Sequence, residues 1–386
     1  MKAPTLKLLL TGGGTGGHVY PALATLEALE RRVVLSVLYV GTSRGIEAQL
    51  VRQKQLPYRS IWIAGFHRRW SWQNLLFPLK LLVSLWQSWW ILRQFRPDVA
   101  VGTGGYVTGP ILWLAARMGI PVVLEEQDVY PGITTRLLAR SARKICLAFD
   151  GARQFLNDES EKIVVTGNPV RRQLISVSPE EARRYWGIPQ NAPVVLVFGG
   201  SQGARAINQA VQQCLNGWLQ NGIYVIWQTG QREYQQVQQT IGTVPDTVHL
   251  LPYIDDMAMA YQAADIVVCR AGAITIAELA LVQKAAVLIP YPFAAGNHQR
   301  KNALFVSEKG AALTIEQNET LASELDAAVQ QLLADPSRRQ AMQQAWKELA
   351  RPDAADKIAD VILQVAKVPV NKPLSHAPQG QSEEAT

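Results

Sequence analysis

The sequence has little cysteine. Cys146, Cys214 and Cys269 are the three in 386 residues, and no two of them form a CxxC pair. This pattern indicates neither a disulfide framework nor a cysteine zinc site, and it favours a reducing, cytoplasmic setting. The apolar run in MKAPTLKLLLTGGG is too short for a signal peptide and predicts a buried first strand instead.

Several signatures of nucleotide and nucleic-acid sites are also missing. Gly12, Gly14 and Gly17 fit G-x-G-x-x-G, but the second strand should end at residues 40–43, VGTS, without the acidic residue that an NAD ribose requires. No GKS or GKT follows a glycine turn, and the chain has no D-x-D, no arginine-rich block and no aromatic RNA motif. These absences argue against NAD, a P-loop, a metal-held diphosphate and a nucleic-acid partner.

The sequence does have an excess of positive charge, +7 at pH 7, which suggests an anionic lipid or a phosphorylated substrate. Short apolar runs alternate with helical segments in two successive series, which predicts two doubly wound parallel-sheet α/β domains. Pro169 within GNPVRRQ marks the joint. We expect domains at 1–168 and 169–350, a last helix at 351–367 and a disordered polar tail at 368–386.

Three expected strands end in glycine-dense turns that open helices. The turns are TGGGTGGHVYPAL at 11–23, GTGGYVTGP at 102–110 and FGGSQGARAIN at 198–208. Glycine admits a ligand close to backbone N–H groups, and the helix start adds partial positive charge, so the turns predict two phosphorylated ligands. Glu278, in CRAGAITIAELA, could accept hydrogen bonds from a ribose diol. The alternative is an ordinary glutamate in the first turn of a helix, where the helix dipole favours a negative charge.

The ordered set of motifs resembles a known family. GGTGGHVYPAL, GTGGYVTGP, TGNPVR, FGGSQGARAIN, YIDDMAMAY, CRAGAITIAE and NHQRKNA occur between Lys7 and Ala350. The chain resembles the MurG-type undecaprenyldiphospho-muramoylpentapeptide N-acetylglucosaminyltransferases, which add N-acetylglucosamine to lipid I and so make lipid II. The resemblance implies a GT-B fold, with two Rossmann-like domains facing across a cleft and the last helix returning to the first domain.

The resemblance also implies site residues. The residues implied for UDP-N-acetylglucosamine are Thr15, Gly16, Gly17, Asp128, Arg171, Ser201, Tyr253, Ile254, Ala273, Ile274, Thr275, Glu278, His298 and Gln299. Those implied for the acceptor diphosphate are Gly14, Gly104, Gly105 and Tyr106. Within the first set, Ser201 and Arg171 match diphosphate contacts, Ile254 matches the backbone that reads uracil, and Glu278 matches the ribose contact. The resemblance implies no cofactor and no metal.

The implied reaction is an inverting displacement, in which the acceptor's C4 hydroxyl attacks the anomeric carbon and UDP leaves. His18 is our candidate base, because the start of a helix disfavours imidazolium and keeps the ring neutral at pH 7. The alternative is a histidine that only caps the helix or binds phosphate, and Asp128 is the second candidate for the base. Family members read HEQN where this chain has Glu125-Glu126-Gln127-Asp128, which replaces an asparagine by a carboxylate at position 128.

The stretch from His67 to Asp98 combines five tryptophans with lysine and arginine. Its apolar run, LLVSLWQSWWIL, would span about 18 Å as a helix, against about 30 Å for a bilayer core. We therefore expect no membrane span. One alternative is a core helix with Leu82, Trp86 and Trp89 on its buried face; the other is a membrane-surface contact. For that contact the residues are Trp70, Trp72, Trp86 and Trp90.

The implied partners are UDP-N-acetylglucosamine, lipid I and the anionic inner face of the cytoplasmic membrane, with cell-wall synthesis proteins as further candidates. The implied location is peripheral, on the cytoplasmic side of that membrane. Three alternatives stay open at this point: a related diacylglycerol glycosyltransferase, a UDP-N-acetylglucosamine 2-epimerase, and a nucleotide-sugar or lipid-binding protein without enzymatic activity.

Overall fold

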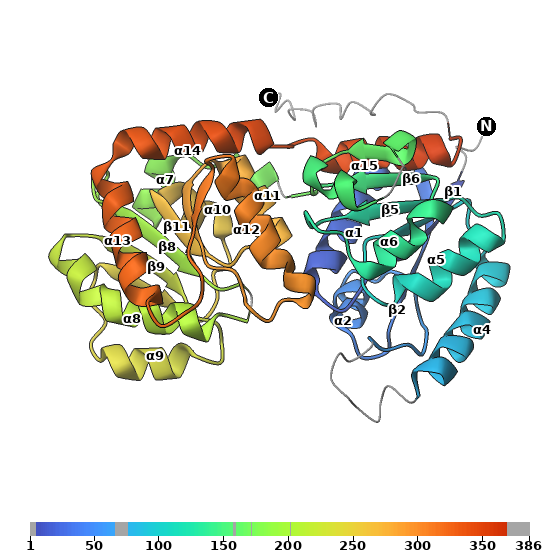
Figure 1. The fold of residues 1–386 in the computed structure, drawn as a ribbon, viewed down its shortest axis with the longest axis horizontal. Coiled ribbons are helices and arrows are strands. Elements are labelled where there is room, and N and C mark those ends of the chain that lie inside the picture. The colour runs from blue at the N-terminus through green and yellow to red at the C-terminus, as the bar shows by residue number, and fades with distance from the viewer. Residues whose placement is uncertain (1–4, 66–75, 157–159, 171, 201, 369–386) are drawn as a thin grey trace, which may run out of the picture. The chain divides into compact units, whose positions relative to one another are not determined.

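The computed structural model describes residues 5–65, 76–156, 160–170, 172–200 and 202–368. They form two compact units. The first unit takes in the described residues up to 124, residues 141–144 and those from 355 onward; the second holds 125–140 and 145–354. Two parallel α/β sheets confirm the expected fold class (Figure 1). The domain boundaries expected from the sequence stay a prediction.

The first sheet has seven strands in the order β3-β2-β1-β4-β5-β6-β7. The pairs β1–β2, β2–β3, β1–β4, β4–β5 and β6–β7 are parallel. The order therefore reverses between β1 and β4. The strands are β1 (Thr5–Thr11), β2 (Val34–Gly41), β3 (Tyr58–Ser60), β4 (Val99–Gly102), β5 (Val122–Glu126), β6 (Lys144–Leu147) and β7 (Ile163–Val165).

The second sheet has six strands in the order β10-β9-β8-β11-β12-β13, and every pair in it is parallel. Its order reverses between β8 and β11. The strands are β8 (Val194–Phe198), β9 (Tyr224–Gln228), β10 (Val248–Leu251), β11 (Ile266–Cys269), β12 (Ala285–Leu288) and β13 (Ala312–Thr314).

Helices follow most of the strands. They are α1 (Gly16–Glu30), α2 (Ile46–Gln53), α4 (Phe77–Phe95), α5 (Thr108–Arg117), α6 (Ile133–Leu138), α7 (Pro179–Tyr185), α8 (Arg205–Gln220), α9 (Tyr234–Ile241), α10 (Met257–Ala263), α11 (Ala273–Val282), α12 (His298–Glu308), α13 (Leu321–Ala334), α14 (Pro336–Leu349) and α15 (Ala354–Val365). Short 3-10 helices lie at Ala139–Ser141, Asp150–Phe155, Ser160–Lys162, Arg172–Ile175 and Ala295–Asn297.

The central strands are buried along their whole length, since all five residues of β8, VVLVF, are inaccessible to water or nearly so. A parallel sheet covered on both faces requires such continuous apolar runs rather than an alternating pattern. The apolar runs in the sequence therefore became the sheet interiors.

The last described helix, α15 (red in Figure 1), belongs to the first unit. Asp356 forms ion pairs with Arg31 and Arg32 at the carboxyl end of α1, with N–O distances of 3.2 and 3.1 Å. Asp360 accepts a third, from Arg32 at 2.5 Å. Two aspartates of α15 therefore fasten it beside the first helix.

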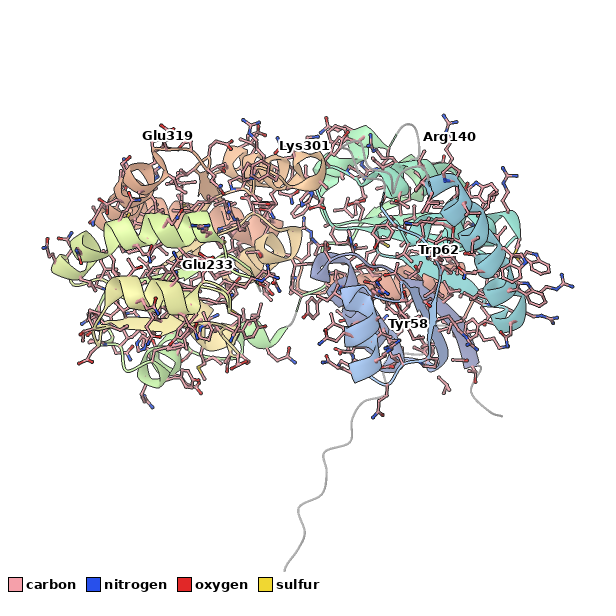
Figure 2. The ribbon with its side chains drawn as sticks, turned by 90° about the horizontal axis from the view of Figure 1, so that it is seen from below. Tyr58, Trp62, Arg140, Glu233, Lys301 and Glu319 are labelled. Carbon is pink, nitrogen blue, oxygen red and sulfur yellow. The ribbon has the colours of Figure 1, made fainter. Side chains whose placement is uncertain are left out.

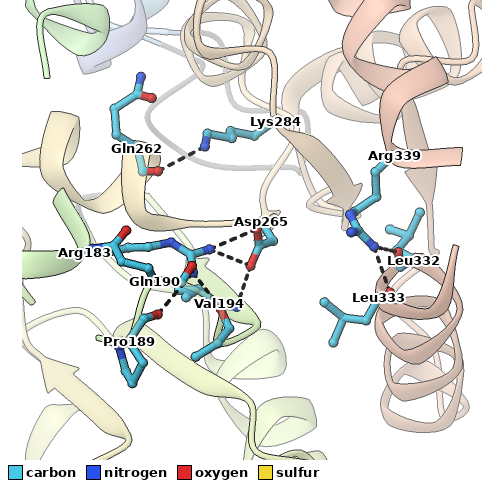
Figure 3. Close-up of polar contacts among 11 residues, drawn as sticks. Arg183, Pro189, Gln190, Val194, Gln262, Asp265, Lys284, Leu332, Leu333 and Arg339 are labelled. Carbon is cyan, nitrogen blue, oxygen red and sulfur yellow. Dashed lines mark hydrogen bonds and ion pairs between the residues drawn. The ribbon is translucent and has the colours of Figure 1, made fainter. Parts of the chain in front are cut away.

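A partly buried ion pair lies at the amino ends of β8 and β11 in the second unit. Figure 3 shows the Arg183 guanidinium reaching the Asp265 carboxylate, with N–O distances of 3.0 and 3.1 Å. Asp265 also accepts the Val194 N–H at 2.8 Å. Nearby, Lys284 donates to the Gln262 carbonyl, and burial lowers the pKa of this lysine to about 8.

We expect Asp265→Ala to lower the free energy of unfolding by about 3 kcal/mol, because it leaves the buried Arg183 without its carboxylate. Urea unfolding followed by tryptophan fluorescence measures the change. Glu316→Ala is the control, since its ion pair with Arg300 is half exposed and worth less than about 1 kcal/mol. Equal losses in the two variants would contradict the expectation.

Candidate functional site

Two of the glycine turns meet at the reversal point of the first sheet. The first turn follows β1 and the second follows β4, and the Gly13 N–H donates to the Gly104 carbonyl at 3.2 Å. At Gly105, where φ is +89°, a Cβ would lie 2.3 Å from the Gly13 oxygen. The glycines therefore permit the two turns to touch. Ligands of doubly wound sheets bind outside the carboxyl ends of strands at this point.

His18 lies in the first turn of α1 and is held by both glycine turns. Its Nδ1 lies 2.9 Å from the Gly13 carbonyl oxygen and 3.3 Å from Thr15 Oγ1. Because a carbonyl only accepts, Nδ1 carries the proton, and the neutral ring has its lone pair on Nε2. A Cβ at position 104 would lie 2.9 Å from Nε2, so Gly104 leaves room for the ring.

The other residues predicted in these turns lie together. Thr15 is the N-cap residue of α1, and Gly16 and Gly17 begin the helix, where backbone N–H groups have no intrahelical partner. Tyr106 is 37% exposed and its ring borders Gly14. The Gly14 N–H is already engaged, since it donates to Glu47 at 3.2 Å.

The sequence did not identify Glu47 as a functional residue. It is the second residue of α2, fully buried, and accepts hydrogen bonds from the Thr42 N–H at 3.0 Å and the Thr42 hydroxyl at 2.6 Å. An acidic residue in the first turn of a helix is common because of the helix dipole, so nothing in the sequence indicates its contact with the glycine turn.

The third glycine turn and the loop CRAGA flank the reversal point of the second sheet, since they follow β8 and β11. At Gly203, where φ is +75°, a Cβ would lie 2.0 Å from the Thr229 oxygen, so this turn packs closely on the loop after β9. Two predicted diphosphate contacts, Arg171 and Ser201, lie outside the described residues.

The segment predicted to read uracil follows β10. Tyr253 is 48% exposed, whereas Ile254 is buried. The Ile254 N–H donates to the Gln228 side-chain oxygen at 3.0 Å, and the Gln228 amide donates to the Gly200 carbonyl at 2.9 Å. Gln228, which the sequence did not single out, thus ties this segment to the third glycine turn.

Ala273, Ile274 and Thr275 form the first turn of α11, and no acidic residue lies in that turn. Glu278 is the sixth residue of the helix, so the alternative of a first-turn glutamate favoured by the helix dipole is wrong. Tyr261 donates its hydroxyl to the Glu278 carboxylate at 3.0 Å. Burial, and then the charge of Glu278, raises the pKa of Tyr261 well above its ordinary value, so the phenol stays protonated and keeps donating.

His298 and Gln299 open α12 after the loop that leaves β12. The His298 Nδ1 lies 2.7 Å from the Ala295 carbonyl oxygen. The Gln299 side-chain oxygen accepts the Tyr291 N–H at 2.9 Å. The amide NH₂ of Gln299 is therefore the part of the side chain that can donate to a sugar hydroxyl. Arg270 fixes the neighbouring loop through the Ile289 and Pro290 carbonyls.

The loop after β5, which departs from HEQN, is clamped on α12. Asn302 is fully buried; it donates to Asp128 at 2.7 Å and accepts the Val129 N–H at 2.9 Å. Lys301, labelled in Figure 2, places Nζ 3.0 Å from the centroid of the Tyr130 ring. The carboxylate at position 128 thus has a defined partner, and Asp128 belongs to the second unit, as do the residues from Tyr253 to Gln299 that are predicted to bind the donor.

Glu126 is a second acidic group in this loop. It accepts the Asp128 N–H at 3.2 Å and the Gly132 N–H at 3.1 Å. Burial, and then repulsion from the Asp128 carboxylate, raises the pKa of Glu126 to about 7. The loop therefore contains a carboxyl group that titrates near neutral pH.

Helix α4 exposes several large apolar side chains. Leu82 is 66% exposed, Trp86 64% and Trp90 52%, while Ser84 and Ser88 are buried. The core-helix alternative, with Leu82 and Trp86 on the buried face, is therefore wrong. Trp70 and Trp72 lie outside the described residues.

Basic side chains accompany these aromatic rings. The Arg93 guanidinium lies 5.2 Å from the Trp89 ring on α4, and that of Arg117 lies 4.8 Å from the exposed Trp113 ring on α5, which packs against α4. Among the described helices, none combines the length and apolar content that crossing a bilayer requires.

No cluster of three His, Cys, Asp or Glu side chains that could hold a metal ion occurs within the described ranges.

Comparison with known proteins gives matches over nearly the whole chain. The family model for the glycosyltransferase family 28 N-terminal domain matches residues 8–147, and that for the C-terminal domain matches residues 194–358. A UDP-N-acetylglucosamine–N-acetylmuramyl-(pentapeptide) pyrophosphoryl-undecaprenol N-acetylglucosamine transferase of Desulforudis audaxviator is 42% identical, over 94% of this chain and 99% of that protein. A protein of the same name from Exiguobacterium sibiricum is 37% identical, over 93% and 99%.

Solved structures agree on the fold. The crystal structure of MurG from Acinetobacter baumannii gives a TM-score of 0.74 with 29% identity, over 93% of this chain and 99% of that one. UDP-GlcNAc 2-epimerase from Neisseria meningitidis gives a TM-score of 0.62 with 16% identity, over 93% and 100%, a likeness of fold alone.

The pKa of Glu126 predicts a pH dependence of stability. A carboxyl whose pKa rises from 4.5 to about 7 on folding binds its proton more tightly in the native state. Its stabilising contribution is complete below pH 4.5 and is lost as the pH rises to 7, a change of about 3 kcal/mol. We expect Glu126→Gln to remove this decline from urea unfolding measured at pH 5 to 8. Glu319→Gln, a change at an exposed site in the same unit, should keep it; an unchanged decline in Glu126→Gln would contradict the assignment.

Proposed function

This chain belongs to glycosyltransferase family 28, and on that premise we propose that it transfers N-acetylglucosamine from UDP-N-acetylglucosamine to undecaprenyl-diphospho-MurNAc-pentapeptide (lipid I), giving lipid II for peptidoglycan synthesis. The observation that carries the proposal is that relatives named for this transfer match 93–94% of the chain at 37–42% identity. Cell-wall biogenesis, and through it cell shape and division, is the process that this activity serves.

In this proposal the second unit binds the donor. The Ile254 carbonyl accepts from uracil N3–H, and the exposed Tyr253 ring covers the base. Glu278, held by Tyr261, accepts from the ribose diol, since a carboxylate offers two oxygens to two hydroxyls. Gln299 and His298 contact the sugar, and Arg171, Ser201 and the helix starts at Gly272–Thr275 balance the charge of the departing diphosphate.

The first unit binds and activates the acceptor. The N–H groups at the start of α1 and the adjoining Gly104–Tyr106 turn hold its diphosphate, and His18 Nε2 takes the proton of the attacking C4 hydroxyl. Asp128 remains the second candidate for the base, and its hydrogen bond to Asn302 equally suits a role in orienting the donor sugar.

We expect purified protein to move labelled N-acetylglucosamine from UDP-N-acetylglucosamine to lipid I. It should not glycosylate diacylglycerol, and without lipid I it should not epimerise UDP-N-acetylglucosamine.

His18→Ala should lower turnover at least about a hundredfold, since a positioned general base contributes about 10²–10⁴ in rate. The affinity for UDP should change little. Asp128→Asn, which restores the family's asparagine, is the matched variant. Near-normal turnover in His18→Ala together with a large loss in Asp128→Asn would move the base to Asp128, and absence of transfer to lipid I by the wild type would refute the function.

We further propose that the exposed face of α4, formed by Leu79, Leu82, Trp86 and Trp90, contacts the cytoplasmic face of the membrane that holds lipid I. Tryptophan beside arginine and lysine is the composition of membrane interfaces, where rings sit at headgroup depth and cations meet anionic lipid. The exposure of these four side chains, each at half or more, supports the proposal. The positive net charge then has an anionic partner.

We expect Trp86→Ser combined with Trp90→Ser to reduce flotation of the protein with liposomes that contain anionic phosphatidylglycerol, because it removes the largest apolar area of this face. The affinity for UDP should not change. Tyr185→Ser is the control, since this exposed aromatic residue belongs to the second unit. Unchanged flotation of the double variant would count against the membrane contact.

A further inference from the structure

The peptide group between Gly13 and Gly14 is hydrogen-bonded at both ends. Its carbonyl, on Gly13, accepts from His18 Nδ1 at 2.9 Å. Its N–H, on Gly14, donates to Glu47 Oε2 at 3.2 Å. A single planar amide therefore stands between a carboxylate and the imidazole that we propose as the base.

The surroundings of Glu47 fix this carboxylate in place. Its other oxygen accepts both the N–H and the hydroxyl of Thr42. A Cβ at Gly13 would lie 2.7 Å from the carboxylate carbon, and one at Gly45 2.3 Å, so glycine is required for the backbone to close around it. A buried carboxylate with three donors has little freedom to move, and the low dielectric of the site strengthens each bond.

We propose that Glu47 is the positioning residue of the base: it polarises the Gly13–Gly14 peptide, which holds the His18 ring with Nδ1 protonated and stabilises the imidazolium that forms during transfer. The inference rests on the proposed function, in which His18 acts on the acceptor. Hydrogen bonds in a chain strengthen one another, and the carboxylate draws the amide proton while the amide oxygen becomes a better acceptor for Nδ1–H.

The proton balance follows from this geometry. His18 Nε2 takes the C4 hydroxyl proton as the oxygen bonds to the anomeric carbon, and UDP leaves with the electron pair of the broken C–O bond. Nδ1 keeps its proton throughout. The partial positive charge at the start of α1 disfavours imidazolium, and the negative charge of Glu47 counteracts this effect.

Among the described residues, tyrosines and an arginine lie near these bonds. The Tyr58 hydroxyl donates to the Thr42 carbonyl at 2.6 Å, and burial and the charge of Glu47 raise the pKa of Tyr58. Arg52 lies 5.9 Å from the Tyr58 ring, Tyr39 donates to the Gly12 carbonyl at 2.8 Å, and Tyr106 borders Gly14. Of these side chains, Glu47 is the one that accepts from the N–H of the Gly13–Gly14 peptide.

The test is a double-mutant cycle in lipid I transfer. Glu47→Gln keeps the size of the side chain and removes its charge. We expect it to lower kcat about tenfold to a hundredfold, part of the 10²–10⁴ of a general base, and to move the acid limb of kcat/KM to lower pH, because imidazolium loses its stabilisation. In the His18→Ala background the same change should have almost no further effect.

Three measurements separate this role from a merely structural one. Glu27→Gln, at an exposed residue of α1 paired with Lys54, is the control for loss of a negative charge and should keep wild-type rates. Histidine ¹⁵N NMR should show the Nδ1–H resonance of His18 moving upfield in Glu47→Gln. Glu47→Asp, which keeps the charge, should hold that resonance near its wild-type position, and it serves if Glu47→Gln does not fold.

An equal loss from Glu47→Gln in the wild-type and His18→Ala backgrounds, or an unmoved Nδ1–H resonance in the folded variants, would overturn the inference. So would an Nδ1–H resonance in Glu47→Asp that is displaced from the wild-type position. Failure of the proposed function has a different signature, since the wild type itself would then transfer nothing to lipid I.

Discussion

Every strand of a parallel sheet ends in a loop whose backbone N–H and C=O groups have lost their ladder partners, and a buried group of that kind must be paired within the protein. In this protein buried polar side chains supply many of those partners. Glu47 accepts a hydrogen bond from the first glycine turn, and Gln228 accepts one from the Ile254 segment. Arg270 donates to the loop after β12, and Asn302 accepts a hydrogen bond from the loop after β5. The loops that carry the candidate site depend on these four residues for their shape.

The same side chains that satisfy the backbone also orient reactive groups. Asn302 binds a backbone N–H with its oxygen and the Asp128 carboxylate with its amide. Glu47 binds the peptide that holds His18. Such buried polar networks are favourable only when every member is paired, and a fully paired network is rigid. Rigidity of this kind is what a site needs if a proton or a sugar is to be placed accurately.

Helix α4 obeys a different constraint. It buries the small Ser84 and Ser88 and exposes Leu82, Trp86 and Trp90. In water such an arrangement loses the free energy of burying those apolar side chains, about 1.5–3 kcal/mol for a leucine. Folding alone therefore does not explain why these side chains are exposed, and the membrane contact that we propose would account for it.

The sequence by itself determined the two parallel sheets, because continuous apolar runs of strand length separated by helical segments have few other ways to be buried. It also determined the glycine turns and, through the motifs, the family. Only the tertiary structure decided that β1 lies between β2 and β4, which brings the turns after β1 and β4 together beside His18. Glu47 and Asn302 could not be predicted, since a carboxylate or amide in an ordinary helix gains its role only from segments 33 and 173 residues away. Strand order and such distant pairings arise from packing, which local sequence patterns do not encode.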